Sequence, residues 1–234
     1  KERIKAAVSD DSDLPNISTI HGLALRIIKE NANYNKIGLD ENFEICDDTL
    51  KERIIKELLY KLKIDDEKYD NFLRCISIVK LSTYNGELYS KYKDIQEFYR
   101  FYEEYNKILK QSNLLDYDDM LCYAVKILEN NREILNYYQN ICKYIIEDEA
   151  QDSTEIQQKL IALLNGKYNN YVRCGDINQA ITSTFTNSDL ESFRNFIGIN
   201  NKVEMVSSQR CAKPIYSFAN SSLNSLCFSA IFSS

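Results

Sequence analysis

The apolar residues between positions 144 and 179 fall into two short runs, and acids and amides follow each run. Tyr144–Ile146 leads into Glu147–Asp152, and Tyr171–Cys174 leads into Gly175–Gln179. Short apolar runs bounded by turn residues are typical of buried strands. Because a buried carboxylate is costly, acids placed directly after a strand predict a site at the edge of a sheet.

The residues between the two runs predict a helix. Asp152–Glu155 places capping acceptors before it, and Asn165–Gly166 would end it. Its apolar residues recur at helical spacing, at Ile156, Leu160, Ile161 and Leu164. A strand, a helix and a second strand form a βαβ unit, so we expect a parallel sheet with polar groups at the carboxyl ends of its strands.

Amphipathic helical patterns dominate the middle of the chain. They cover Lys51–Leu62, Tyr69–Leu81 and Tyr89–Lys110 and predict an all-helical insertion. We interpret the aromatic residues of the third stretch as a helix-packing core rather than a platform for stacking bases. Asp116–Asp119 would begin a further helix, since acids suit a helix N-terminus, and a loop would then lead to the strand before Asp148.

Shorter patterns organise the two ends of the chain. Ile17–Ile20 predicts a short strand that runs into a buried helix from Leu23, and Asn31–Asp40 predicts a turn-rich loop. Val203–Val206 predicts another strand, and a helix would begin near Pro214.

Composition narrows the class of protein. The 234 residues are 44% hydrophobic with a net charge of −6, which excludes a disordered chain and a basic surface that coats nucleic acid, although binding through a local groove stays open. Seven cysteines without a CxxC pair and a single histidine argue against a zinc site and a complete disulfide framework, so we expect reduced thiols in a cytoplasmic protein. No apolar run is long enough to span a membrane.

Five segments, in this order and spacing, resemble the first motor domain of superfamily 1 DNA helicases of the UvrD/Rep/PcrA type. They are Thr19–Arg26 (TIHGLALR), Leu115–Leu121 (LDYDDML), Ile146–Asp152 (IEDEAQD, like the Walker B segment), Gly175–Ile181 (GDINQAI) and Ser208–Asn220. The resemblance implies an α/β fold with a RecA-like parallel sheet of the P-loop NTPase type, here partial, and an all-helical insertion subdomain. Residues 1–43 and 111–234 would form the motor domain, and residues 44–110 the insertion.

The resemblance also implies roles in ATP hydrolysis. Asp148 would hold Mg²⁺, and Glu149 would polarise the attacking water as general base. Gln151 and Gln179 would link the γ-phosphate to the DNA groove, and Arg210 would neutralise developing charge as an arginine finger.

Further residues are implied to bind ligands. Asp176 would bind the nucleotide together with Gln151. Thr19 and His21 would contact single-stranded DNA, and Phe185 would supply a base-stacking ring. The substrate would be single-stranded DNA or a junction of single and double strands. The protein would separate the strands of the duplex with 3′–5′ polarity. Repair, recombination, plasmid replication and defence all stay open as pathways.

One departure from the family is plain. The pattern G-x-x-x-x-G-K-[ST], which cradles phosphates, is absent from the chain. We expect the phosphate loop upstream of Lys1 and a second motor domain downstream, so this fragment alone should be inactive.

Two other functions compete with a helicase. One is a non-catalytic DNA-binding or scaffolding module that has lost its phosphate loop. The other is a metal-dependent nuclease that uses Asp148, Glu149 and Asp176, although no lysine follows the paired acids as in nucleases. Asp148 and Glu149 could also be ordinary surface acids, and His21 a buried histidine with satisfied hydrogen bonds.

Overall fold

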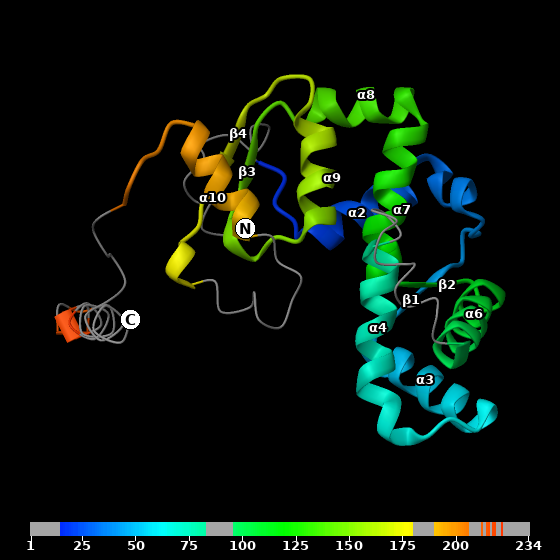
Figure 1. Ribbon diagram of the computed structural model, residues 1–234. Coiled ribbons are helices and arrows are strands. Elements are labelled where there is room, and N and C mark those ends of the chain that lie inside the picture. Colours follow the sequence, from blue (N-terminus) through cyan, green and yellow to red (C-terminus); the bar gives the residue numbers. More distant parts are fainter. Residues whose placement is uncertain are drawn as a thin grey trace. The chain divides into compact units, whose positions relative to one another are not determined.

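The computed structural model describes residues 15–82, 96–179 and 190–205, and single residues between 212 and 221. The chain divides into two compact units, residues 1–190 and residues 191–234, and each is described by itself. The helices and strands of the first unit are α2 (Ile20–Lys29), β1 (Glu44–Cys46), α3 (Asp48–Leu62), α4 (Tyr69–Ser82), α6 (Gln96–Gln111), β2 (Leu114–Asp116), α7 (Tyr117–Asn130), α8 (Arg132–Ile141), β3 (Ile145–Glu147), α9 (Glu155–Asn165) and β4 (Tyr171–Arg173) (Figure 1). Helix α10 (Leu190–Ile199) begins at the boundary and belongs almost wholly to the second.

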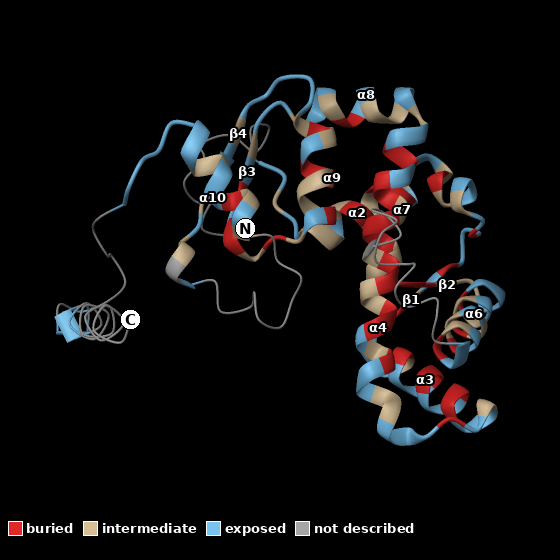
Figure 2. Cartoon of the chain, in the orientation of Figure 1, coloured by how far each residue is buried: buried red, intermediate tan, exposed pale blue. Residues whose placement is uncertain are grey.

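A first hydrophobic core surrounds α7, which contacts α2, α8 and α9. Buried residues occur on most sides of α7 (Figure 2), as expected for a helix enclosed by other elements. Ile27 and Ile28 of α2 and Leu160 of α9 are fully buried in this core. The apolar spacing noted between residues 156 and 164 therefore serves this packing.

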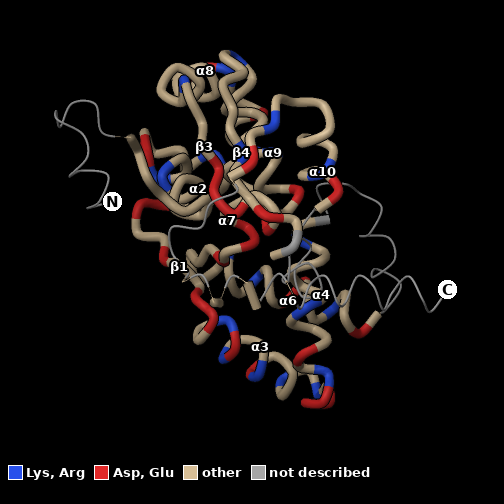
Figure 3. The backbone as a smooth tube through the Cα atoms, turned by 90° about the vertical axis from the view of Figure 1, so that its left-hand side faces the viewer, with Lys and Arg blue, Asp and Glu red and all other residues tan. Residues whose placement is uncertain are grey.

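A second hydrophobic core lies among α3, α4 and α6. Phe98 and Phe101 of α6 are buried there, and Phe72 of α4 contacts both rings at 5.3 Å and 4.9 Å between centroids. The interpretation of the aromatic stripe as helix-packing core is thus confirmed. Basic and acidic residues are interspersed along α3 (Figure 3), as on a solvated helix surface. The two cores draw on residues 24–43 with 115–164 and on residues 46–109, but the predicted domain division stays a prediction.

Two small parallel sheets accompany the helices. Strand β3 pairs with β4 in parallel, with Glu147 opposite Arg173, as the βαβ pattern predicts. Strand β1 pairs with β2 in parallel at the two ends of the helical region, and this pair was not predicted. The described residues are therefore mostly helical with small parallel sheets, which is compatible with a partial α/β fold.

A cluster of buried charges joins the two cores, and we call it the Lys80 cluster. It consists of Lys80 of α4, Asp116 and Asp119 at the start of α7, and Tyr105 of α6. Lys80 Nζ lies 2.7 Å from Asp116 Oδ2 and 2.5 Å from Asp119 Oδ2. The Tyr105 hydroxyl donates to Asp116 Oδ2 at 2.9 Å. The predicted helix after Asp116 is confirmed. Asp116 and Asp119 lie at its N-terminus, as expected, and they also form ion pairs with Lys80.

Two predictions near the ends of helices are wrong. The region before β3 is helix α8 rather than a loop, because Ile134, Leu135 and Tyr138 pack against the first core. Residues 17–20 do not form a strand. The Thr19 hydroxyl instead accepts from Gly22 N at 3.0 Å and caps α2, which starts at Ile20.

The ends of α9 and one C-terminal strand also differ from prediction. The helix is capped at Thr154 rather than Asp152, and Gln157 Oε1 accepts from Thr154 N at 2.9 Å. Gly166 has a right-handed φ of −57°, so it is not the left-handed cap that glycine usually provides. Residues 203–205 have no regular structure, whereas Pro214 is helical as expected.

Within the described residues, no helix combines the length and the apolar character needed to cross a bilayer. Cysteines 46, 75, 122, 142 and 174 are free thiols, as the sequence suggested. The described part of the chain also holds no group of three or more His, Cys, Asp or Glu residues arranged around a metal position.

Candidate functional site

The two acidic turns predicted from the sequence meet at the carboxyl ends of β3 and β4. Cys174 N donates to Glu147 O at 2.8 Å, and Ala150 N donates to Cys174 O at 2.9 Å. These bonds extend the parallel ladder beyond the strands. They hold the turn at Asp148 and Glu149 against the start of the segment Gly175–Gln179.

Glu149 has an unusual backbone conformation. Its φ of 52° and ψ of 41° are left-handed, which is uncommon for any residue except glycine and recurs at functional sites. The side chains of Glu149 and Asp148 are exposed, so both carboxylates are open to a ligand. Magnesium usually takes only one or two carboxylates together with substrate phosphates, and an exposed Asp148 fits that donor set.

A continuous chain of hydrogen bonds connects four of the residues predicted to act. Gln151 is 1% exposed, and its Nε2 donates to Glu149 Oε2 at 2.8 Å. Gln151 Oε1 accepts from Asp176 N at 3.2 Å. Gln179 Nε2 then donates to Asp176 Oδ2 at 2.9 Å. These three bonds link the Gln179 side chain to the Glu149 carboxylate through Asp176 and Gln151, and we call them the Glu149–Gln179 chain.

A buried ion pair lies beside the turn at Asp148 and Glu149, and sequence reasoning missed it. Arg173 Nε donates to Glu147 Oε2 at 2.7 Å, and both side chains are 3% exposed. The hydroxyls of Ser153 and Tyr171 also donate to the Glu147 carboxylate. Burial and this hydrogen bond raise the pKa of Tyr171. The signal in the sequence was Glu147 directly after the first apolar run and Arg173 within the second, but only the register shows that they face each other.

The predicted DNA-contact residues lie at the start of α2. The His21 ring meets Tyr117 edge-on at 5.8 Å between centroids. Burial lowers the pKa of His21, and the nearby Asp118 carboxylate opposes that effect. Described hydrogen bonds do not connect Thr19 or His21 to the Glu149–Gln179 chain. Phe185 and Arg210 lie outside the described residues.

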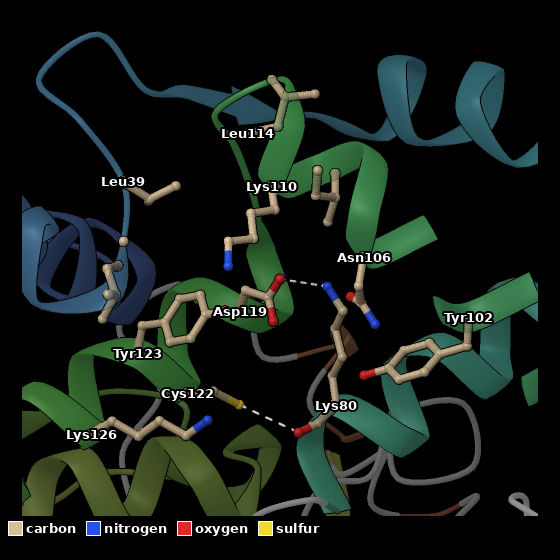
Figure 4. A pocket seen from close by; sticks show the side chains of 13 residues that line it. Leu39, Lys80, Tyr102, Asn106, Lys110, Leu114, Asp119, Cys122, Tyr123 and Lys126 are labelled. Atoms are coloured by element: carbon tan, nitrogen blue, oxygen red, sulfur yellow. Dashed lines mark hydrogen bonds and ion pairs between the residues drawn. The ribbon is translucent and has the colours of Figure 1, made fainter. Parts of the chain in front are cut away.

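A cavity of about 360 Å³ lies elsewhere, where α6, α7 and the Gly38 loop meet (Figure 4). Lys80 and Asp119 face each other in it, and Tyr102 and Asn106 line it from α6. The residues predicted to act are absent from its lining. The cavity therefore adds nothing to the site at β3 and β4.

Comparison with known proteins identifies the family. Residues 1–198 match the UvrD/REP helicase N-terminal domain. An ATP-dependent DNA helicase PcrA of Staphylococcus aureus strain Mu50 is 29% identical over 201 residues, which cover 84% of this chain and 27% of that protein. An ATP-dependent DNA helicase PcrA of Staphylococcus epidermidis strain RP62A is 30% identical over 203 residues, with the same coverage of 84% and 27%. This chain thus spans about a quarter of the length of these relatives. The chain belongs to the family of the UvrD/REP helicase N-terminal domain.

Proposed function

We propose that this chain supplies the hydrolytic turn of an ATP-dependent DNA helicase that moves along single-stranded DNA in the 3′–5′ sense. The Glu149–Gln179 chain carries the proposal, because it joins a candidate general base to the second acidic turn through direct hydrogen bonds. The printed names of the relatives, ATP-dependent DNA helicases, support the same activity.

The proposed reaction is attack of water on the γ-phosphate of ATP. Glu149 accepts the proton of that water, since its carboxylate is exposed and Gln151 Nε2 donates to it at 2.8 Å. Asp148 holds Mg²⁺, which would neutralise charge on the phosphates when bound. The chain has no G-x-x-x-x-G-K-[ST] pattern, so the phosphate loop would come from residues outside it.

The other assigned roles belong to the same proposal. Thr19 and His21 contact single-stranded DNA or a junction, and Phe185 stacks on a base. Arg210 acts as the arginine finger, and a second motor domain completes the ATPase. Residues 44–110 form the helical insertion, a division supported by the separate core of α3, α4 and α6.

The test is ATP hydrolysis by the intact gene product, with and without single-stranded DNA. We expect DNA to stimulate turnover, and Glu149→Gln to reduce it by roughly 10² or more, since general-base catalysis contributes about that factor. Glu133→Gln, an exposed acid in the first turn of α8, is the matched control and should leave turnover unchanged.

Three outcomes separate the competing functions. Turnover that Glu149→Gln leaves intact would show that Glu149 is not the base. DNA binding without turnover in the wild type would mean a scaffold of helicase ancestry. Magnesium-dependent DNA cleavage without ATP would instead favour the nuclease.

A further inference from the structure

The side chain of Arg173 bonds on both sides of the two-residue turn that carries Asp148 and Glu149. Its Nε donates to Glu147, which directly precedes the turn, at 2.7 Å. Its Nη2 donates to the carbonyl oxygen of Ala150, which directly follows the turn, at 3.3 Å. A planar guanidinium can make such a fork, whereas a lysine ammonium is a single point of charge.

Glu147 completes this arrangement by joining three segments. It sits on β3, it pairs with Arg173 across the register, and it accepts from Tyr171 on β4. It also accepts from Ser153, which follows the 3₁₀ turn Ala150–Asp152. The segments on both sides of Asp148 and Glu149 are therefore fixed to one buried carboxylate.

A gain in stability does not by itself explain why the Glu147–Arg173 ion pair is present. Moving two charges out of water is costly, and well-packed apolar residues in their place are often neutral or stabilising. Paired interior positions on parallel strands usually carry apolar side chains. Meanwhile the turn contains a left-handed Glu149, a conformation that persists only where its surroundings hold it.

We propose that Arg173, together with Glu147, is a positioning residue for ATP hydrolysis that holds the Glu149 turn in its reactive conformation. This inference rests on the proposed function of Glu149 as general base. Small displacements of a catalytic group reduce the rate of reaction much more than the binding of substrate. Loss of the pair should thus lower kcat while the KM for ATP changes little.

The experiment uses the intact protein and two variants. The double variant Glu147→Leu/Arg173→Met replaces the ion pair with apolar residues and leaves no buried charge alone. Arg173→Lys keeps the charge but removes the fork. The double variant Glu52→Gln/Lys56→Gln removes an exposed ion pair on α3 and is the matched control.

We expect the apolar double variant to fold and to bind single-stranded DNA as well as the wild type, although it should melt at a lower temperature because the Ser153 and Tyr171 hydroxyls lose their acceptor. Its kcat should fall by about 10- to 100-fold, with the KM for ATP within about twofold. Arg173→Lys should lose about tenfold in kcat, since the Ala150 carbonyl loses the hydrogen bond from the Arg173 guanidinium. The amide of Ala150 should also exchange its hydrogen faster in both variants, a measurement that needs no turnover.

Each result decides the matter. A folded double variant with wild-type kcat would overturn the positioning role of the pair. If that variant fails to fold, Arg173→Lys decides, and wild-type kcat in it overturns the proposal. A wild type that shows no ATP turnover overturns the proposed function itself, so the two failures are distinguishable.

Discussion

Lys80 keeps its charge in the interior because two carboxylates surround its ammonium group. Burial alone would lower the pKa of Lys80, but Asp119 and Asp116 outweigh that effect and raise it. Burial would raise the pKa of Asp116, but Lys80 and Lys51 together lower it. Burial raises the pKa of Asp119 to about 6, although Lys80 opposes the change. The ionised form of Asp116, which has Lys80 and Lys51 beside it, is thus stabilised more fully than that of Asp119.

The raised pKa of Asp119 predicts a pH dependence of stability. The folded state takes up this proton near pH 6, while an unfolded aspartate does so only near pH 4. The contribution of Asp119 to the free energy of unfolding should therefore increase as pH falls from about 7 to 4, and be lost as pH rises through 6. Urea unfolding at pH 5 and pH 7.5 should show that Asp119→Asn removes about 1–3 kcal/mol of this dependence.

The control for this measurement is Asp48→Asn, an exposed acid in the first turn of α3. It should keep the pH dependence of the wild type. An unchanged dependence in Asp119→Asn would show that the proton binds elsewhere.

At the scale of elements, the two parallel strands β1 and β2 are held together at their start by a pair of side chains. Asn113 Nδ2 donates to Asp40 Oδ1 at 2.6 Å, and Asp40 N donates to Asn113 Oδ1 at 3.1 Å. Asn113 is also left-handed, with φ of 52°, a conformation that asparagine tolerates better than most residues. The same residue therefore fixes both the turn before β2 and its link to the segment before β1.

Substitution of Asn113 should separate these two contributions. Asn113→Ala removes the hydrogen bonds and strains the backbone, so we expect a loss of about 2–3 kcal/mol in the free energy of unfolding. Asn113→Gly removes only the hydrogen bonds and should lose about 1 kcal/mol less. Denaturant unfolding measures both, with the exposed Asn42→Ala as control. Equal losses in the two variants would mean that the left-handed φ carries no strain.

Elements with a long repeating pattern could be predicted from the sequence. Helices α3, α4 and α7 have periodic apolar faces over 14 or 15 residues, and their existence is confirmed. Strands β1 and β2 have three residues each, too few for any period to appear. Helix α8 has apolar residues at helical spacing, at Ile134, Leu135, Tyr138 and Ile141, and was missed because ten residues interrupted by Asn136, Gln139 and Asn140 resemble a polar loop.

For the candidate site, the sequence predicted where the acids lie but not which side chains contact each other. Acids that follow apolar runs located Asp148, Glu149 and Asp176 at one sheet edge, and the β3–β4 pairing agrees. The link from Gln151 to Asp176 depends on side-chain geometry that no spacing encodes. The Glu147–Arg173 pair depends on register, which becomes known only when both strands are placed together.

At the scale of the whole first unit, two cores meet through the Lys80 cluster and the β1–β2 pair. Lys51 of α3 adds a further bridge to Asp118 of α7 at 3.2 Å. Because the Lys80–Asp116 pair is buried and the Lys51–Asp118 bridge is largely shielded from water, we expect the two cores to unfold together rather than separately.

Phe101→Ala tests this coupling. The ring is fully buried in the second core, and its loss should cost about 3–5 kcal/mol. Hydrogen exchange should then quicken in α9 of the first core as well as in α6. The control is Tyr60→Ala, since that ring is 87% exposed and its loss should change stability by less than about 0.5 kcal/mol. Faster exchange confined to α3, α4 and α6 would mean that the cores unfold independently.

The left-handed backbone of Glu149 has an evolutionary consequence. Glycine would adopt that φ of 52° without strain, so the substitution that most relaxes the turn also removes its carboxylate. A selection for heat resistance alone would favour glycine there, whereas a selection for ATP turnover would retain the acid. The residue that most favours stability at position 149 therefore differs from the residue that ATP turnover requires.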